Sequence, residues 1–182
     1  MSMLEKVRST LGSYGEADVR SLLHADHERI RDLAKTLAEG ESRPQRQAAL
    51  RDLKPFLAAH SRSEEATVYA RLMALRNSPD SRAAGNEGMV EHNVVDILME
   101  RLAASTDSGS DLWKAHATVV HELLEHHIKE EENDIFEELG EHFSEEEREA
   151  MGAEFVAKRD KLLTQRTKTP AARRSKTASA AA

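Results

Sequence analysis

The sequence predicts an all-α protein: an up-down antiparallel four-helix bundle with a short N-terminal amphipathic segment and an extra C-terminal helix. Apolar residues recur every three to four positions through long segments, which is the spacing of one helix face. The four prolines and eight glycines cluster between these segments. Alternating runs of valine, isoleucine and aromatic residues, which would indicate β-strands, are missing. Four long helices with short connections favour an antiparallel bundle.

The helices are placed by the apolar spacing and by the polar stretches that interrupt it. An amphipathic lead runs from Met3 to Leu11, and the interrupting stretches are ESRPQ, RNSPDS and STDSGSD. Ser144 is followed three residues later by Glu147, a capping-box signature that predicts a fifth helix reaching about Leu163. The four main helices are expected at about residues 16–37, 44–75, 83–102 and 112–139.

A length of 182 residues fits one main domain with appended ends. The last part of the chain contains a proline, many small residues and no apolar periodicity, so we expect it to be a disordered basic tail. The predicted division is a lead segment at 1–15, the bundle at 16–140, an additional C-terminal helix at 141–166 and the tail at 167–182.

Charge and composition exclude several classes of function. The formal charge is −7, and the tail contributes four basic residues and no acidic one, which leaves −11 on the rest of the chain. An acidic body argues against nucleic-acid binding as the main activity. The absence of cysteine excludes disulfides and thiolate zinc sites. No signal-peptide core or run of ~20 apolar residues is present, so we expect a cytoplasmic protein without a membrane partner.

Each main helix carries a histidine on its apolar stripe. Two of these histidines are followed four residues later by a glutamate, Glu64 or Glu131, one helical turn away on the same face. A charged glutamate on a core stripe is costly unless another group pairs with it. The four histidines are His27, His60, His92 and His127.

The chain repeats this pattern. HSRSEEATVY and HIKEEENDIF place the same residue classes at the same offsets. His27 precedes His60 by 33 residues, and His92 precedes His127 by 35 residues. Each pair of helices therefore offers one histidine and then a His-x3-Glu unit. Two such half-sites, related by an approximate two-fold axis, would form a centre for two ions.

The ligand types narrow the choice of metal. Imidazole nitrogen and carboxylate oxygen suit iron, manganese or zinc, whereas calcium and magnesium prefer oxygen alone. Four imidazoles with two carboxylates placed to bridge favour a di-iron pair over a closed structural zinc site. The zinc peptidase motif H-E-x-x-H does not occur. The competing interpretation is a metal-free helical interaction module with hydrogen-bonded core histidines. The doubled motif weighs against it.

The motifs resemble the hemerythrin-like family, the HHE cation-binding domain, over about residues 16–140. The matching pieces are LLHADHERI, HSRSEEATVY, EHNVVDIL and HIKEEENDIF. The resemblance implies a four-helix bundle that holds a non-haem di-iron centre, with Glu64 and Glu131 bridging the ions. Carried over residue by residue, the implied ligands are His27, His60, Glu64, His92, His127 and Glu131.

One position departs from the oxygen-carrying hemerythrins, which have a second histidine where this chain has Asp96. Those carriers also end with His-x4-Asp, so the chain is more similar to the family's shorter bacterial type. The resemblance alone therefore does not imply reversible oxygen transport. An aspartate or water at this position, or an open one, remains compatible with the sequence.

The remaining candidates near the motifs have other expected roles. Glu65 and Glu132 fall off the stripe, so we expect them to be solvated or in contact with a ligand. We expect Tyr69 and Phe136 to be core residues, and the Tyr69 hydroxyl can also hydrogen-bond to a ligand. Surface positions are expected for His24, His116, His121, His126 and His142.

Three functions follow from a di-iron centre. The leading hypothesis is a protein that binds O2, NO or peroxide at an open iron position. The second is an iron- or redox-sensing regulator that signals to a protein partner through the C-terminal helix or the tail. The third is an enzyme that consumes peroxide or NO. The sequence does not rank these cleanly, because it identifies no general acid and no substrate pocket.

Overall fold

The computed structural model describes residues 17–105 and 107–167, and the prediction of an all-α protein is confirmed. The described part of the chain contains helices and no strand. The predicted lead segment, and the predicted tail from residue 168 onward, lie outside the described residues. In chain order the elements are α2 (Val19–Glu39), α3 (Arg43–Glu64), η1 (Glu65–Tyr69), α4 (Ala70–Ala74), α5 (Pro79–Ala104), α6 (Asp111–Glu130), η2 (Glu131–Ile135), α7 (Phe136–His142) and α8 (Glu145–Thr167).

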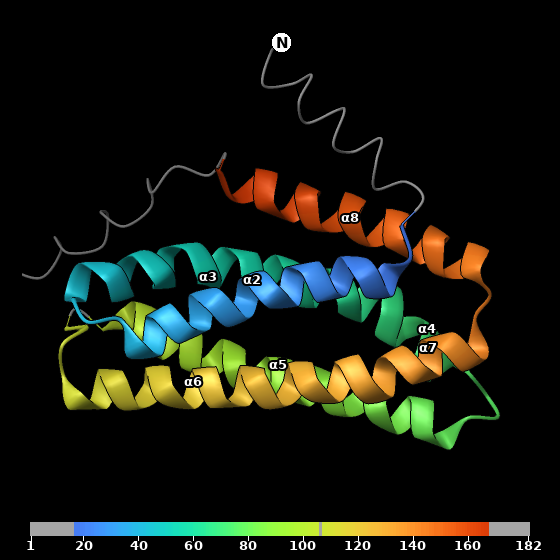
Figure 1. The fold of residues 1–182 in the computed structure, drawn as a ribbon, viewed down its shortest axis with the longest axis horizontal. Helices are drawn as coiled ribbons and strands as arrows, with labels where there is room; N and C mark the ends of the chain where they lie inside the picture. Colours follow the sequence, from blue (N-terminus) through green and yellow to red (C-terminus); the bar gives the residue numbers. More distant parts are fainter. Residues whose placement is uncertain (1–16, 106, 168–182) are drawn as a thin grey trace, which may run out of the picture.

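Four long helical stretches lie side by side, and a further helix covers one side of them (Figure 1). Helix α2 packs against α3 and α6, and α5 packs against α6. Helix α8 lies along the outside of the α2 and α3 pair. The C-terminal helix expected from its capping box is thus present and docked on the helices that carry His27 and His60.

Side-chain caps begin the helices. Asp18 accepts a hydrogen bond from the Arg20 backbone N–H, and Ser42 forms a capping box with Gln45 at the start of α3. Helix α5 begins four residues earlier than the sequence spacing indicated. Ser78 caps it and Pro79 occupies a first-turn position, where the missing N–H costs nothing. The proline in RNSPDS therefore starts a helix and does not belong to the preceding loop.

The second and fourth long stretches were expected to be continuous α-helices, and that expectation was wrong in detail. Each changes to a single π-helical turn, η1 at Glu65–Tyr69 and η2 at Glu131–Ile135. The two turns occur at nearly matching places in the two His-x3-Glu units, since η1 begins one residue after Glu64 and η2 begins at Glu131. A π-turn makes i→i+5 hydrogen bonds and inserts one residue into the helix face, often at functional sites. One inserted residue changes the apolar spacing so little that the sequence pattern does not reveal the π-turn.

Two apolar clusters fill the bundle interior, and a layer of buried polar residues separates them. One cluster, with Leu53 and Trp113, lies toward the α2–α3 connection, and the other, with Leu23 and Phe155, lies toward the start of α8. Along α2, His27 falls between a residue of one cluster and a residue of the other. The polar layer thus lies in a dry interior, where charges interact strongly.

Among the described helices, none combines the length and apolarity needed to cross a bilayer.

Candidate metal centre

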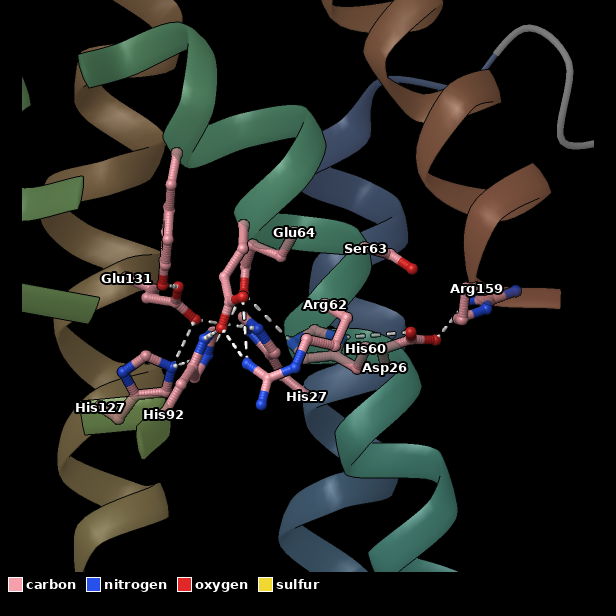
Figure 2. A network of polar contacts seen from close by, with 12 residues as sticks. Asp26, His27, His60, Arg62, Ser63, Glu64, His92, His127, Glu131 and Arg159 are labelled. Carbon is pink, nitrogen blue, oxygen red and sulfur yellow. Dashed lines mark hydrogen bonds and ion pairs between the residues drawn. The ribbon is translucent and has the colours of Figure 1, made fainter. Parts of the chain in front are cut away.

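Six side chains from the four long stretches converge in this buried layer (Figure 2). They form two groups of four residues. Within each group the ligand atoms lie within 4.8 Å of one another, and both groups contain Glu64 and Glu131. One group adds His27 and His60 to the two glutamates, and the other adds two histidines from α5 and α6. All six are almost inaccessible to solvent. They are the six residues proposed as ligands, His27, His60, Glu64, His92, His127 and Glu131.

Each glutamate lies between one histidine of each half. Glu64 Oε2 is 3.5 Å from His60 Nε2 and 3.7 Å from His92 Nε2. Glu131 Oε2 is 3.3 Å from the Nε2 atoms of both His27 and His127. A carboxylate in this position faces both halves of the centre at once, as a bridging ligand must.

The opposite ring nitrogen of every one of these histidines meets a carboxylate. Since a carboxylate only accepts hydrogen bonds, each Nδ1 donates and each Nε2 is the ring nitrogen that faces the centre. The Nε2 atoms of His92 and His127 lie 3.1 Å apart, within hydrogen-bond distance of each other. Each partner comes from another helical segment than the histidine it holds. The Nδ1 to oxygen distances are 3.0 Å for His27 to Glu132, 3.3 Å for His60 to Asp26, 3.1 Å for His92 to Glu65 and 2.7 Å for His127 to Glu91.

These contacts follow the approximate two-fold relation of the half-sites. The acidic residue just before the first histidine of each half, Asp26 or Glu91, holds the second histidine of the same half. The residue just after each motif glutamate, Glu65 or Glu132, holds the first histidine of the other half. The sequence repeat therefore extends to the groups that orient the histidine rings.

Three of these four carboxylates also accept a hydrogen bond from an arginine. Arg31 donates to Glu132 at 3.0 Å, and Arg62 donates to Glu65 at 2.8 Å. Arg159 of α8 donates to Asp26 at 2.6 Å, so the additional helix joins the network. The guanidinium groups hold the carboxylates ionised and fixed in direction.

The centre contains buried polar atoms that no protein group satisfies. Both oxygens of Glu64, Oε2 of Glu131 and Nε2 of His27 have no hydrogen-bond partner among the described residues. The 3.3 to 3.7 Å contacts to the histidines lie within ion-pair range but are not aligned as hydrogen bonds. A buried carboxylate without a partner is costly. A cation between the two glutamates and the Nε2 atoms would remove this cost, so the residues fit a bound metal.

The electrostatics of the centre favour positive charge. Burial alone would lower the pKa of His60, but Glu64 and Asp26 outweigh it and raise the pKa to about 10. In the same way, Glu131 and Glu91 raise the pKa of His127 to about 9. Burial would raise the pKa of Glu131, yet the neighbouring histidines hold that pKa well below its ordinary value. Protons and a metal ion therefore compete for the same imidazole nitrogens.

The chain matches the family described as hemerythrin HHE cation binding domain over residues 18–139. The protein belongs to the hemerythrin HHE family. A protein named DNA nickase, from Nostoc sp. (strain PCC 7120 / SAG 25.82 / UTEX 2576), is 21% identical over 147 residues. That alignment covers 81% of this chain and 40% of the relative, so the chain spans less than half of the relative's length. No solved structure matches the chain.

The π-turns bring two aromatic residues onto this HHE centre. Because a π-turn places residues five apart on the same side, Tyr69 follows Glu64 inward, and Phe136 follows Glu131 inward. Tyr69 is fully buried, stacks on His92 and donates its hydroxyl to Glu131 Oε1. Phe136 stacks on His27 with 6.3 Å between ring centroids. Both pack as core residues, and Tyr69 also makes the hydrogen bond considered for it.

Asp96 belongs to neither of the two four-residue groups that together contain the six candidate ligands. It forms an ion pair with Arg62 instead. Within the described residues, α5 therefore supplies one nitrogen to the HHE centre, from His92, and no carboxylate takes the place of the carriers' second histidine.

The histidines that the sequence analysis did not propose as ligands lie outside the two buried groups. His24 has 56% of its side chain exposed and contacts Glu132, and His126 is 60% exposed and pairs with Glu130. Sequence reasoning did not assign orienting roles to Asp26 and Glu91. The signal was an acidic residue directly before the first histidine of each half. What each acid contacts depends on how the helices pack.

Proposed function

We propose that the protein binds two metal ions, that these are iron, and that the resulting di-iron centre binds a small oxidant. The observation that carries the proposal is the convergence of four Nε2 atoms on two buried carboxylates, of which both Glu64 oxygens and Glu131 Oε2 have no hydrogen-bond partner among the described residues. We also infer that the four long stretches follow the up-down order of the HHE bundle and that the protein works in the cytoplasm. Iron accepts this mixture of imidazole and carboxylate ligands, as do manganese and zinc.

The roles of the residues follow from their contacts. The histidines would each give one Nε2 atom, and Glu64 and Glu131 would bridge the ions and balance their charge. The carboxylates on Nδ1 fix the ring directions and make the imidazoles more basic. An iron pair bound here would supply redox chemistry toward O2, NO or peroxide.

The side of the centre near His92 suits a small oxidant. With Asp96 turned toward Arg62, α5 offers no further ligand there. The Tyr69 hydroxyl lies at this side, and burial and the charge of Glu131 raise its pKa well above the ordinary value. Tyr69 therefore keeps its proton and remains a hydrogen-bond donor at the centre.

Metal content per chain tests the proposal directly. Protein made in iron-supplemented cells and purified without a histidine tag should contain about two iron atoms per chain by mass spectrometry. His60→Ala should lose iron, whereas His116→Ala, on α6 outside both groups, should retain it. Protein that retains no tightly bound metal would identify the inward histidines as core residues and overturn the proposal. A full complement of manganese would overturn the choice of iron. A full complement of zinc, which has no redox chemistry, would overturn oxidant binding as well and leave only the metal centre.

A second candidate function is regulation through α8, and a specific contact favours it. Arg159 of α8 donates to Asp26, and Asp26 accepts from His60 Nδ1, so the helix is linked to a ligand by two hydrogen bonds. Phe155 of α8 also packs edge-on against the His60 ring, with centroids 5.7 Å apart. Binding of metal at His60 would then change how firmly α8 is held, and a protein partner would read the change.

Limited proteolysis tests this candidate. Removal of iron should increase cleavage after Phe143 several-fold, because the Arg159–Asp26–His60 link loosens. Cleavage in the loop between α2 and α3 serves as the internal control and should not change. An identical digestion pattern with and without iron would argue against regulation through α8.

DNA nicking, the activity in the name of the Nostoc relative, is not proposed for this chain. The chain covers 40% of that protein. A surface pocket that includes His127 and Glu131 is also lined by Glu87, Glu91, Glu130 and Asp134, and carboxylates repel phosphate.

A further inference from the structure

A small pocket leads from the surface to one half of the metal centre. Its volume is about 60 Å³, and it lies between α5 and the junction of α6 with η2. At its inner end are His127 and Glu131, two of the proposed ligands, and Tyr69 forms one wall. The pocket thus reaches the half of the centre that contains His92 and His127.

Carboxylates dominate the outer part of this pocket. Glu87 and Asp134 are exposed at the surface, and Glu91 and Glu130 are half-buried. No lysine or arginine is among the lining residues, and His127 at the inner end is their only histidine. His126, outside the lining, pairs with Glu130 at 3.2 Å. Such a cluster raises the local concentration of cations and lowers that of anions.

The inner end of the pocket contains a buried carboxylate. Glu131 is buried, and its Oε2 atom has no hydrogen-bond partner among the described residues. The pocket therefore runs from exposed carboxylates to a buried carboxylate with one oxygen, Oε2, that has no hydrogen-bond partner among the described residues. A neutral gas would gain little from these carboxylates, whereas a divalent cation is attracted to the mouth and, once it displaces the proton of His127, to Glu131.

Gly88 keeps the wall of the pocket in place. A Cβ atom at this position would collide with the hydroxyl and ring of Tyr69. The glycine lets Tyr69 lie flat between α5 and the centre, where its hydroxyl donates to Glu131. The other half of the centre is different, because Phe155 and Arg159 of α8 cover His60 and its partner Asp26.

We propose that this pocket is the port through which divalent cations reach the centre. Glu87, Glu130 and Asp134 gather the hydrated cation at the mouth and pass it to Glu131 and His127. The inference rests on the proposed function, because it presupposes that the centre binds metal. It adds that the cations arrive from one side, and it gives the three carboxylates at the mouth, two of them exposed and Glu130 half-buried, a role in the rate of loading.

The test compares two triple variants with the same change in charge. The port variant is Glu87→Gln with Glu130→Gln and Asp134→Asn. The control is Glu39→Gln with Glu41→Gln and Asp52→Asn, three exposed carboxylates far along the bundle from the pocket. Metal-free full-length protein is mixed with Fe²⁺ without oxygen, or with Co²⁺ for its visible absorption. Uptake is followed by stopped flow at low and high salt, and the final metal content is then measured.

We expect the port variant to load about tenfold more slowly at low salt, the lower end of electrostatic steering. High salt should remove most of that difference, and the final metal content should equal that of the unmodified chain. The control should load like the unmodified chain. Ala84→Leu, which places a larger side chain in the pocket without altering a ligand, should slow loading at every salt concentration.

The outcomes separate the port from the proposed function. If the unmodified chain takes up no metal, the proposed function fails and the port fails with it. If it takes up metal and both triple variants load at its rate, the port is wrong and the metal centre stands. A lower final metal content in the port variant would also overturn the port, since it would make those carboxylates part of the metal site.

Discussion

The two halves of the centre have the same ligand chemistry and different surroundings. In each half, two histidines face the shared glutamates, and carboxylates hold both Nδ1 atoms. The half with His27 and His60 is covered by α8, through Phe155 and Arg159. The half with His92 and His127 lies beside Tyr69 and the acidic pocket.

This difference separates two tasks that a symmetric site would combine. The covered half is linked to a helix outside the four long stretches, so it is suited to transmit the state of the centre. The half beside the pocket is suited to admit cations. The repeat thus supplies the candidate ligands of both halves, and the elements around it differentiate the halves.

The largest expected effect tests what the halves share. Glu64→Gln and Glu131→Gln should each weaken the binding of both ions by at least 10 to 100-fold, because each carboxylate faces one histidine of each half. Competition with a chelator, together with metal content, measures the loss. Glu65→Gln, which contacts His92 and not the shared glutamates, is the control and should affect one ion only. Loss of a single ion in Glu64→Gln would assign that glutamate to one half.

The next effect should separate the halves. Arg159→Gln frees Asp26 and should weaken one ion roughly tenfold, and Arg159→Lys should restore part of the loss. Arg62→Gln is the matched change behind His92, and it should cost less because Arg62 is 46% exposed and Arg159 only 13%. A two-step metal titration distinguishes the ions. Equal weakening of both by Arg159→Gln would show that α8 is not coupled to one half.

A smaller effect concerns the aromatic residues after the π-turns. Tyr69→Phe leaves Glu131 Oε1 without its donor, which should lower the free energy of unfolding of the metal-free protein by about 1–3 kcal/mol. Phe136→Leu, in the other half, removes a stacking contact and should cost about 1 kcal/mol. Urea unfolding measures both. A Tyr69→Phe protein as stable as the unmodified one would mean that the hydroxyl bond contributes nothing.

The smallest effect lies outside both halves, where α2 begins beside α8. Asp18 caps α2 and accepts a hydrogen bond from Arg148, so Asp18→Ala should cost about 1 kcal/mol with no change in metal content. Burial alone would raise the pKa of Asp18, but hydrogen bonds from Arg20 and Arg148 hold it at about 2, below its ordinary 3.8.

A lowered folded-state pKa means that the ionised aspartate stabilises the fold above pH 4 and that this contribution is lost as pH falls toward 2. The stability gap between the unmodified chain and Asp18→Ala should therefore be smaller at pH 3 than at pH 6. Asp18→Asn retains a capping side chain and should reproduce mainly the charge-dependent part. A gap that widens in acid would contradict this account.

Much of the helix layout could be predicted from the sequence, because apolar spacing and caps act within a few residues. The Ser144–Glu147 capping box predicted the start of α8. The start of α5 was missed because the whole polar stretch RNSPDS was taken as the interruption between helices, whereas Ser78 caps α5 and Pro79 lies in its first turn. The π-turns were missed because a single inserted residue hardly disturbs a periodic pattern.

The sequence by itself determined which six residues face inward, since position on a helical stripe and the His-x3-Glu repeat are local properties. It also determined the family, through motifs that hold the same residue classes. Only the tertiary structure decided that Asp26, Glu65, Glu91 and Glu132 orient the histidines across helix boundaries. It alone decided that α8 covers one half while the acidic pocket reaches the other. Such contacts join residues up to about a hundred positions apart, and their partners are set by how the helices pack rather than by their spacing in the chain.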